Sequence, residues 1–427
     1  MRRSGAQPLD FFYTSPFSGL SELIPDRRRL RSLVYGYRGV DYEDYEDELT
    51  SLLLTPSLLE RLGVRSYQGS PLPALSFGTT PLRLRELTVW RCIPCLSHQL
   101  GSLTSLNLLC QRDIFANINS LLNALRCSPH LEELVFGGDF RSGAELQHPQ
   151  EHKIVSIPLR SLKRLHVCHL SVETTRRFLG ALDLPPNRIF MRFTGVSADL
   201  GDIFPETVTP NVSPHAATKV ELVYPASRGV IIHVTNGIAY TRLTYRRPPA
   251  DNSFLHWTTE KPRGDRPLKE LWLHLLCFDG ERYYRVPSSR ALCDLETLII
   301  EANPNEKLGS VLFPMLSPTE NGVPSPFLST LELRGVLEVG TLGEILKARS
   351  DAGSRLKTLR IMWSYGCEAR IAPLAQFVDK LDSCRVGDET SRGLELPGEC
   401  MTRGVWWEPW YRDFAGVIEQ SLVGGTY

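Results

Sequence analysis

The sequence lacks several features that would point directly to a ligand or a compartment. Its net charge is zero, because 48 Lys and Arg residues balance 48 Asp and Glu residues, which leaves no overall attraction to nucleic acid or to an anionic membrane. No apolar run approaches the roughly 20 residues of a membrane span, and none of signal-peptide length follows Arg2 and Arg3. We therefore expect a cytoplasmic or nuclear protein that binds neither nucleic acid nor membranes.

Cysteine is sparse and scattered along the chain. The ten cysteines form no dense framework, which is typical of reduced thiols in an intracellular protein. Cys92 and Cys95 make up the one C-x-x-C pair, but a tetrahedral zinc site needs two further ligands of comparable spacing. No second pair exists, so we favour a structural role for Cys92, as a turn residue, over zinc or redox chemistry. No metal and no other cofactor is expected.

Catalytic signatures are missing as well. The phosphate loop G-x-x-x-x-G-K-S/T, the dinucleotide signature G-x-G-x-x-G, the nucleophile elbow G-x-S-x-G and the zinc-protease pattern H-E-x-x-H do not occur. His148 and His152 are close in sequence, but Pro149 between them would break the helix that could align them on a metal. The chain offers no candidate catalytic residue, and we predict that it is not an enzyme.

What the sequence does contain is a repeat. Leu-x-x-Leu-x-Leu recurs about every 27 residues, with single steps from about 19 to about 33, which is the pattern of an irregular leucine-rich repeat array. The middle residues of the clear copies are Leu33, Leu62, Leu87, Leu106, Leu134, Leu165, Leu271, Leu298, Leu331 and Leu359. Degenerate copies around Met191, Val220 and Leu243 fill the gap between them.

The pattern predicts an α/β solenoid. Apolar residues at every second position point to one side of a short strand, and a single strand of this kind cannot bury them. Parallel stacking of successive strands covers the leucines and places a curved sheet on the concave face, with helices and loops on the convex face. Helical spacing and Pro stops predict such return helices at 117–125, 173–182, 342–348 and 373–381.

We assign residues 28–386 to the solenoid, 1–27 to an N-terminal cap and 387–427 to a C-terminal cap or tail. The tail concentrates aromatic residues between Trp406 and Phe414, which either cover the open end of the array or form an exposed anchor for a partner. The acidic, tyrosine-rich stretch at 41–48 is either a solvated loop or a second docking segment.

The candidate binding site is the outward face of the strands. Residues that alternate with the leucines face away from the core, and large apolar side chains there favour a protein ligand, since tryptophan is enriched among residues that dominate interface energies. Alternatively, loops from the insertions at 205–214, 245–267 and 303–326 or from the C-terminus fold over these positions. The candidate residues are Trp90, Leu109, Val135, His166, Trp272, His274, Ile299, Arg334, Arg360 and Met362.

Two stretches, L-R-C-S-P-H-L-E-E-L at 125–134 and S-L-K-R-L at 161–165, resemble fungal, mushroom-type F-box proteins with leucine-rich repeats. The segment from Arg3 to Asp10 is similar to the one that follows the F-box in that family, so 1–27 is either a cap or a post-F-box remnant. The resemblance implies a substrate receptor of a cullin ubiquitin ligase. We recognise no F-box before Asp10, so a Skp-type adaptor is expected as a partner only if an F-box lies upstream; the alternative is a free-standing interaction scaffold.

Overall fold

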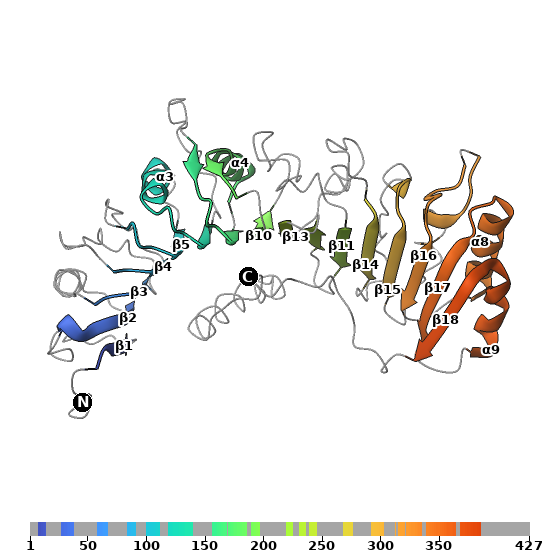
Figure 1. Ribbon diagram of the computed structural model, residues 1–427, viewed down its shortest axis with the longest axis horizontal. Helices are drawn as coiled ribbons and strands as arrows, with labels where there is room; N and C mark the ends of the chain where they lie inside the picture. The colour runs from blue at the N-terminus through green and yellow to red at the C-terminus, as the bar shows by residue number, and fades with distance from the viewer. Residues whose placement is uncertain are drawn as a thin grey trace, which may run out of the picture. The chain divides into compact units, whose positions relative to one another are not determined.

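A computed structural model provides the structure of the chain. It describes residues 7–13, 27–37, 58–66, 83–90, 100–111, 118–139, 156–168, 170–185, 189–196, 219–224, 230–235, 239–245, 268–275, 292–302, 312, 315–320, 322–334, 339–363 and 368–385. The chain divides into unit 1, Met1–Thr194 with Phe204–Thr209, and unit 2, Gly195–Ile203 with Pro210–Tyr427. Each unit contains a parallel sheet and helices, so the predicted α/β class is confirmed (Figure 1).

Unit 1 is built on a ladder of parallel strands that follow one another in chain order. The ladder begins earlier than the repeat pattern indicated, because β1 lies within the segment that we assigned to the N-terminal cap and pairs with β2. The strands are β1 (Leu9–Tyr13), β2 (Leu30–Tyr37), β3 (Arg61–Ser66), β4 (Glu86–Trp90), β5 (Ser105–Gln111), β6 (Glu133–Asp139), β8 (Arg164–Cys168) and β10 (Ile189–Val196).

The leucines of unit 1 lie in register. Leu62 pairs with Leu33 on one side and with Leu87 on the other, and the same row continues strand by strand to Met191. Every described member of this row is buried. Burying one leucine contributes about 1.5–3 kcal/mol, so the row explains why a one-residue slip of any strand is disfavoured.

The backbone links each repeat to the next in the same way. The carbonyl of Arg85 accepts hydrogen bonds from the amides of Thr104 and Ser105, and the carbonyl of Thr104 accepts from Glu132 and Glu133. Unit 2 repeats this arrangement, in which Lys269, Glu296 and Ser329 serve as the acceptors. These bonds satisfy the polar backbone where each strand begins.

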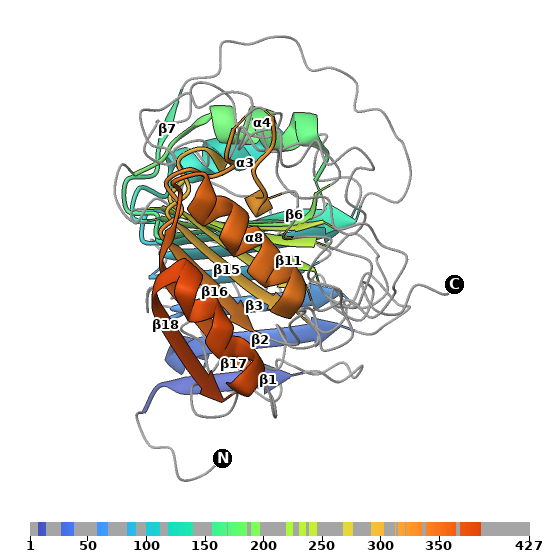
Figure 2. The same cartoon turned by 90° about the vertical axis from the view of Figure 1, so that its right-hand side faces the viewer.

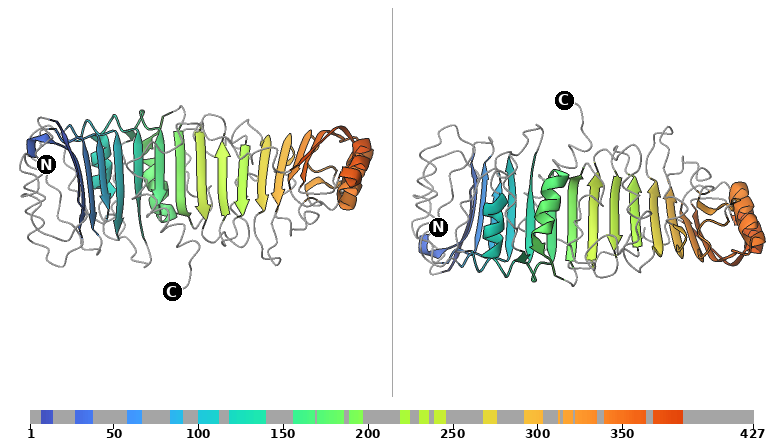
Figure 3. Two further views of the ribbon diagram at one scale, coloured as in Figure 1. Left: turned by 90° about the horizontal axis from the view of Figure 1, so that it is seen from below. Right: turned by 90° about the horizontal axis from the view of Figure 1, so that it is seen from above.

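Two helices of the described part of unit 1 lie on one side of its sheet. Helix α3 (Ile118–Arg126) confirms the helix predicted at 117–125, and α4 (Val172–Gly180) confirms most of 173–182. Ser171 caps α4 by accepting a hydrogen bond from the Thr174 amide. After α4, the short strand β9 (Leu182–Asp183) pairs in parallel with β7 (Ile157–Pro158), which precedes β8 in the chain. In Figure 3 the strands lie in front of the helices in one view and behind them in the other.

Unit 2 has a second parallel ladder, formed by β11 and β14 to β18. Leu298 pairs with Leu271 and Leu331, and Leu331 pairs with Leu359, so the predicted repeats are in register here too. The strands are β11 (Lys219–Tyr224), β14 (Glu270–Leu275), β15 (Thr297–Ala302), β16 (Thr330–Arg334), β17 (Leu356–Trp363) and β18 (Val378–Arg385).

The degenerate copy at Leu243 is not a simple parallel repeat. Leu243 lies on β13 (Ala239–Tyr245), which is antiparallel to β12 (Val230–Thr235), and β12 is antiparallel to β11. The connections 225–229 and 236–238 are too short for the crossover that parallel neighbours need. The sequence signal that we missed is Asn236-Gly237 between two β-rich stretches, which is a strong hairpin signal.

The unit 2 helices correct one prediction. Helix α8 (Val339–Asp351) contains the predicted 342–348, but the helix predicted at 373–381 is wrong. Helix α9 (Glu368–Ile371) and the 3-10 helix η5 (Ala372–Phe377) come first, and Leu381 lies in β18 opposite Leu359. Pro373 suits a helix start, but from Val378 onward the chain pairs with β17 as a further parallel strand instead of continuing as a helix. In Figures 1 and 2, α8 and the α9–η5 segment lie on the same side of β17 and β18.

Arg27–Arg29 forms a 3-10 helix, η1, directly before β2. Arg31, on β2, forms an ion pair with Asp10 of β1. The acidic stretch at 41–48 lies outside the described residues. Within the part of the chain that the structure describes, no helix combines the length and apolar character needed to cross a bilayer.

Candidate functional site

The candidate residues of unit 2 share one face of its sheet, which we call the β14–β17 face. Strand alternation places it opposite the buried leucines. The pairing of the strands arranges its side chains in three rows. The rows are Glu270, Thr297, Thr330 and Thr358; Trp272, Ile299, Glu332 and Arg360; and His274, Glu301, Arg334 and Met362.

Trp272 lies at the centre of a group of contacts on β14. Its indole Nε1 donates a hydrogen bond to Glu270 Oε1 at 2.6 Å, and its ring stacks on the His274 ring with centroids 6.2 Å apart. The guanidinium carbon of Arg334 lies 5.9 Å from the centroid of the Trp272 ring, within cation–π range. Ile299 packs beside the indole. These contacts restrict the orientation of the aromatic ring.

The apolar side chains of this face are less exposed than we expected. Trp272 is 8%, Ile299 7% and Met362 3% exposed, so the prediction that they face solvent freely is wrong. Neighbouring strands stand about 4.8 Å apart, and side chains of the same row therefore cover one another's flanks. Arg334 and His274 further reduce the exposure of the indole.

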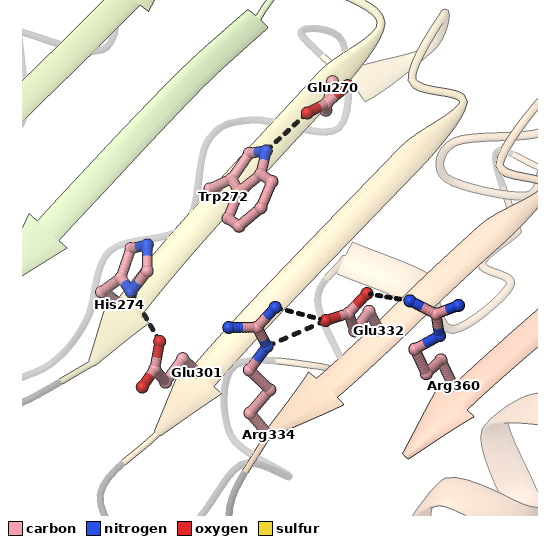
Figure 4. A network of polar contacts seen from close by, with 7 residues as sticks. All are labelled: Glu270, Trp272, His274, Glu301, Glu332, Arg334 and Arg360. Atoms are coloured by element: carbon pink, nitrogen blue, oxygen red, sulfur yellow. Dashed lines mark hydrogen bonds and ion pairs between the residues drawn. The ribbon is translucent and has the colours of Figure 1, made fainter. Parts of the chain in front are cut away.

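Glu332 connects two arginines (Figure 4). Its Oε1 accepts hydrogen bonds from Arg334 Nε at 2.8 Å and Nη2 at 2.6 Å. Its Oε2 lies 3.7 Å from Arg360 Nη1, which is an ion pair but too long for a good hydrogen bond. Glu332 and Arg334 are buried, whereas the Arg360 side chain is 36% exposed. One buried carboxylate thus faces two guanidinium groups.

His274 and Glu301 form the other polar contact across the strands. His274 Nδ1 lies 2.9 Å from Glu301 Oε2, and the carboxylate can only accept, so Nδ1 carries the proton. His274 is buried, and Glu301 is partly exposed. The sequence pattern placed Glu270, Glu301 and Glu332 on this face, but we did not count them as candidate residues. The register shared with Trp272, His274 and Arg334 was the signal that could have found them.

Val135 and His166, the candidates of unit 1, are paired on β6 and β8 and are both buried, so Val135 does not face solvent freely either. His166 Nε2 lies 3.1 Å from Cys168 Sγ. Burial raises the pKa of the Cys168 thiol to about 12, and the charge of Arg192 opposes that shift. The thiol is therefore protonated at neutral pH and is a poor nucleophile.

A row of charges crosses unit 1 next to these residues. Arg61 Nε lies 3.3 Å from Glu86 Oε1, and Arg164 Nη1 lies 3.8 Å from Glu133 Oε1. Desolvation raises the pKa of Glu86, with Arg61 lowering it and Glu133 and Glu60 raising it further. Arg61 and Arg164 thus stand at the two ends of the row, and Ser105 separates the carboxylates of Glu86 and Glu133 between them.

Several predicted features lie outside the described residues. The side chains of Trp90 and Leu109 are in this group although β4 and β5 contain their backbones. The others are Cys92 with Cys95, His148 with His152, the insertion at 205–214, the insertion at 245–267 apart from Tyr245, and the aromatic stretch from Trp406 to Phe414. Among the described residues, no group of three or more His, Cys, Asp or Glu side chains is arranged to hold a metal ion.

Comparison of the chain with protein-family models gives no match, and comparison with curated protein sequences gives no significant match.

Proposed function

We propose that the chain is a non-enzymatic protein-recognition module built as a leucine-rich repeat solenoid, and that the β14–β17 face binds a polypeptide. The proposal extends to its role: a substrate receptor similar to that of an F-box ubiquitin ligase. One observation carries the binding proposal, namely the buried Glu332–Arg334 pair that fixes Trp272 and Arg360 on an outward sheet face.

The solenoid part is supported by repetition within each unit. The leucine rows run in register through successive parallel strands, and the strand-start hydrogen bonds recur from repeat to repeat. Stacked repeats of this kind grow lengthwise. Small-angle X-ray scattering of the full chain tests this part: an elongated particle is expected, and the radius of gyration of a compact globule, about 22 Å for this length, would contradict it.

The binding part is supported by the kinds of residue and by their preorganisation. Tryptophan and arginine dominate the energetics of protein interfaces, and both occur here with neighbours that hold their side chains. A side chain already ordered in the free protein loses less conformational entropy on binding. The threonine row of the face is partly exposed, which leaves hydroxyl groups accessible beside the charged rows.

Affinity capture with the full chain tests the binding part. Proteins retained by the wild type and lost from Trp272→Ala would be quantified by mass spectrometry, with Lys357→Ala, an exposed residue of β17, as the control. We expect Trp272→Ala alone to lose a defined set of proteins although its melting curve shows that it is still folded under the capture conditions. If capture is lost only in proportion to the fraction that is unfolded, the ring belongs to the core and the proposal is contradicted.

The same preparation separates the two roles. A Skp-type adaptor that co-purifies with the wild type and with Trp272→Ala supports the ubiquitin-ligase role, because adaptor docking through an upstream F-box would not involve the β14–β17 face. Reproducible absence of an adaptor, with other partners retained, favours a free-standing interaction scaffold.

A further inference from the structure

The charges of the β14–β17 face, extended by β18, are unevenly matched. Each described carboxylate there has a hydrogen-bonded neighbour. Glu270 accepts from Trp272, Glu301 from His274, Glu332 from Arg334, and Asp382 from Lys380 Nζ at 2.9 Å. Among the described residues, Arg334 and Lys380 each have a carboxylate at hydrogen-bond distance, but Arg360 does not.

Arg360 is nevertheless held in place. Glu332 Oε2 lies 3.7 Å from its Nη1, and Asp382 is its register partner on β18 but is bonded to Lys380. The negative charge of Glu332 is divided between two guanidinium groups, and Arg334 takes the two short contacts. Coulomb attraction keeps Arg360 near Glu332, but the paired N–H groups of the Arg360 guanidinium remain able to donate two parallel hydrogen bonds to another carboxylate. The side chain is 36% exposed, so a ligand can reach it.

We infer that Arg360 is the charged anchor of the partner site and takes the carboxylate of an Asp or Glu side chain from an extended polypeptide. A planar guanidinium and a carboxylate match in two parallel hydrogen bonds. Glu332 carries one negative charge for two guanidinium groups, and an incoming acidic residue would supply the second. This inference rests on the proposed function, and it adds the chemistry of the partner.

The residues around Arg360 should make it discriminate between partners with one acidic residue and partners with several. Glu332 and Asp382 are its register partners on β16 and β18, so a partner with several acidic residues would meet repulsion beside the anchor. Thr330 and Thr358 occupy the adjacent row. The face therefore favours one acidic residue flanked by neutral or basic ones, which is a pattern that peptide selection can detect.

The test is selection of a phage-displayed random 12-residue peptide library on the immobilised full chain. For the wild type we expect enriched peptides to share one Asp or Glu at a fixed position. Arg360→Glu should lose these peptides and enrich Lys or Arg at that position, whereas Lys357→Glu, an exposed position on the same strand, should select the wild-type peptides.

Fluorescence anisotropy of the most enriched peptide makes the result quantitative. Arg360→Gln should raise the Kd at least about tenfold. Arg360→Lys keeps the positive charge but not the planar group that forms two parallel hydrogen bonds, so its Kd should lie between those of the wild type and Arg360→Gln. Thermal melting of each variant shows whether it is folded. Peptides that bind Arg360→Gln as tightly as the wild type would overturn this inference and leave the proposed function standing. A selection that enriches no peptide over the bare surface would overturn both.

Discussion

The Glu332 carboxylate accepts two hydrogen bonds from the Arg334 guanidinium, and both side chains are buried on an outward face of the unit 2 sheet. The two residues are two positions apart on β16 and therefore lie on the same face, so the pair fixes both side chains within one strand. Contacts from Arg334 to Trp272 and from Glu332 to Arg360 then extend the order to β14 and β17. A surface that binds a partner benefits from such order, although the pair itself need not add stability.

Removing one member of the pair should cost more than removing both. Glu332→Leu leaves Arg334 without its carboxylate, and losing one partner of a buried ion pair typically destabilises by about 3–5 kcal/mol. The double variant Glu332→Leu with Arg334→Met should recover part of that loss, because no charge is left unpaired between them. Urea unfolding of both single variants and the double variant gives the coupling free energy. A coupling near zero would show that the contact does not order the strand.

The second prediction tests the register of the leucine rows. Leu298→Ala truncates a fully buried residue between Leu271 and Leu331, and such a truncation costs about 2–5 kcal/mol. We expect a clear fall in melting temperature. Glu296→Gln, at an exposed position just before the same strand, should change the melting temperature little. Equal melting of Leu298→Ala and the wild type would mean that Leu298 is not in the core.

These rows were predictable from the sequence because period-2 apolar spacing and a regular repeat both act locally. Leu298 and Leu331 could be paired by counting residues alone. Counting residues could not predict whether Glu332 bonds to Arg334 or to Arg360. Both arginines lie within reach, and side-chain packing decides which one forms the short hydrogen bonds. Leu381 shows a different limit: its helical spacing after Pro373 competed with a strand position opposite Leu359, and only the neighbouring strand resolves the choice.

The third prediction concerns the close approach of β6 and β8 at Gly137. A Cβ atom on Gly137 would lie 2.3 Å from the Cys168 carbonyl oxygen and 2.5 Å from its Cβ. Gly137→Ala must therefore push the two strands apart, at a cost of about 1–3 kcal/mol or more. Gly340 on α8 has nothing within 4 Å of its Cβ position, so Gly340→Ala should stabilise by about 0.5–1 kcal/mol. Chemical denaturation should therefore show a lower free energy of unfolding for Gly137→Ala and a higher one for Gly340→Ala. An unchanged free energy of unfolding for Gly137→Ala would contradict the close approach of β6 and β8.

Cys168 gives a prediction with a pH sign. Because burial raises the pKa of the thiol to about 12 from an unfolded value of 9.0, the unfolded chain loses this proton first as the pH rises. The contribution to stability is full below about pH 9 and falls between pH 9 and 12, by about 1.4 kcal/mol per pH unit. At neutral pH, peptide-resolved iodoacetamide labelling should modify Cys168 only after unfolding, whereas exposed Cys293 reacts in the folded chain. Rapid labelling of native Cys168 would contradict its burial.

The last prediction concerns Arg349, a fully buried residue of α8. Its guanidinium donates to backbone carbonyls: Nη1 to Pro324 at 2.8 Å and to Leu316 at 3.3 Å, and Nη2 to Ser325 at 2.9 Å. Desolvation lowers its pKa to about 10, which still leaves it charged at neutral pH. Ser325 has a φ of 51°, which is unusual for a residue other than glycine. Arg349 therefore holds a strained turn against the helix.

Arg349→Met should destabilise the chain by about 2–4 kcal/mol, because the carbonyls of Leu316 and Pro324 lose the hydrogen bonds that Arg349 donates. Arg349→Lys should be intermediate, since one ammonium cannot span the same carbonyls. Ser325→Gly, which removes the strain, should raise stability by up to about 1 kcal/mol in the wild type, but less in Arg349→Met if losing the clamp lets the turn relax. Hydrogen exchange at the Leu328 amide, which donates to the Ser325 carbonyl, reports the turn directly. Unchanged exchange there in Arg349→Met would show that the turn holds its shape without the arginine.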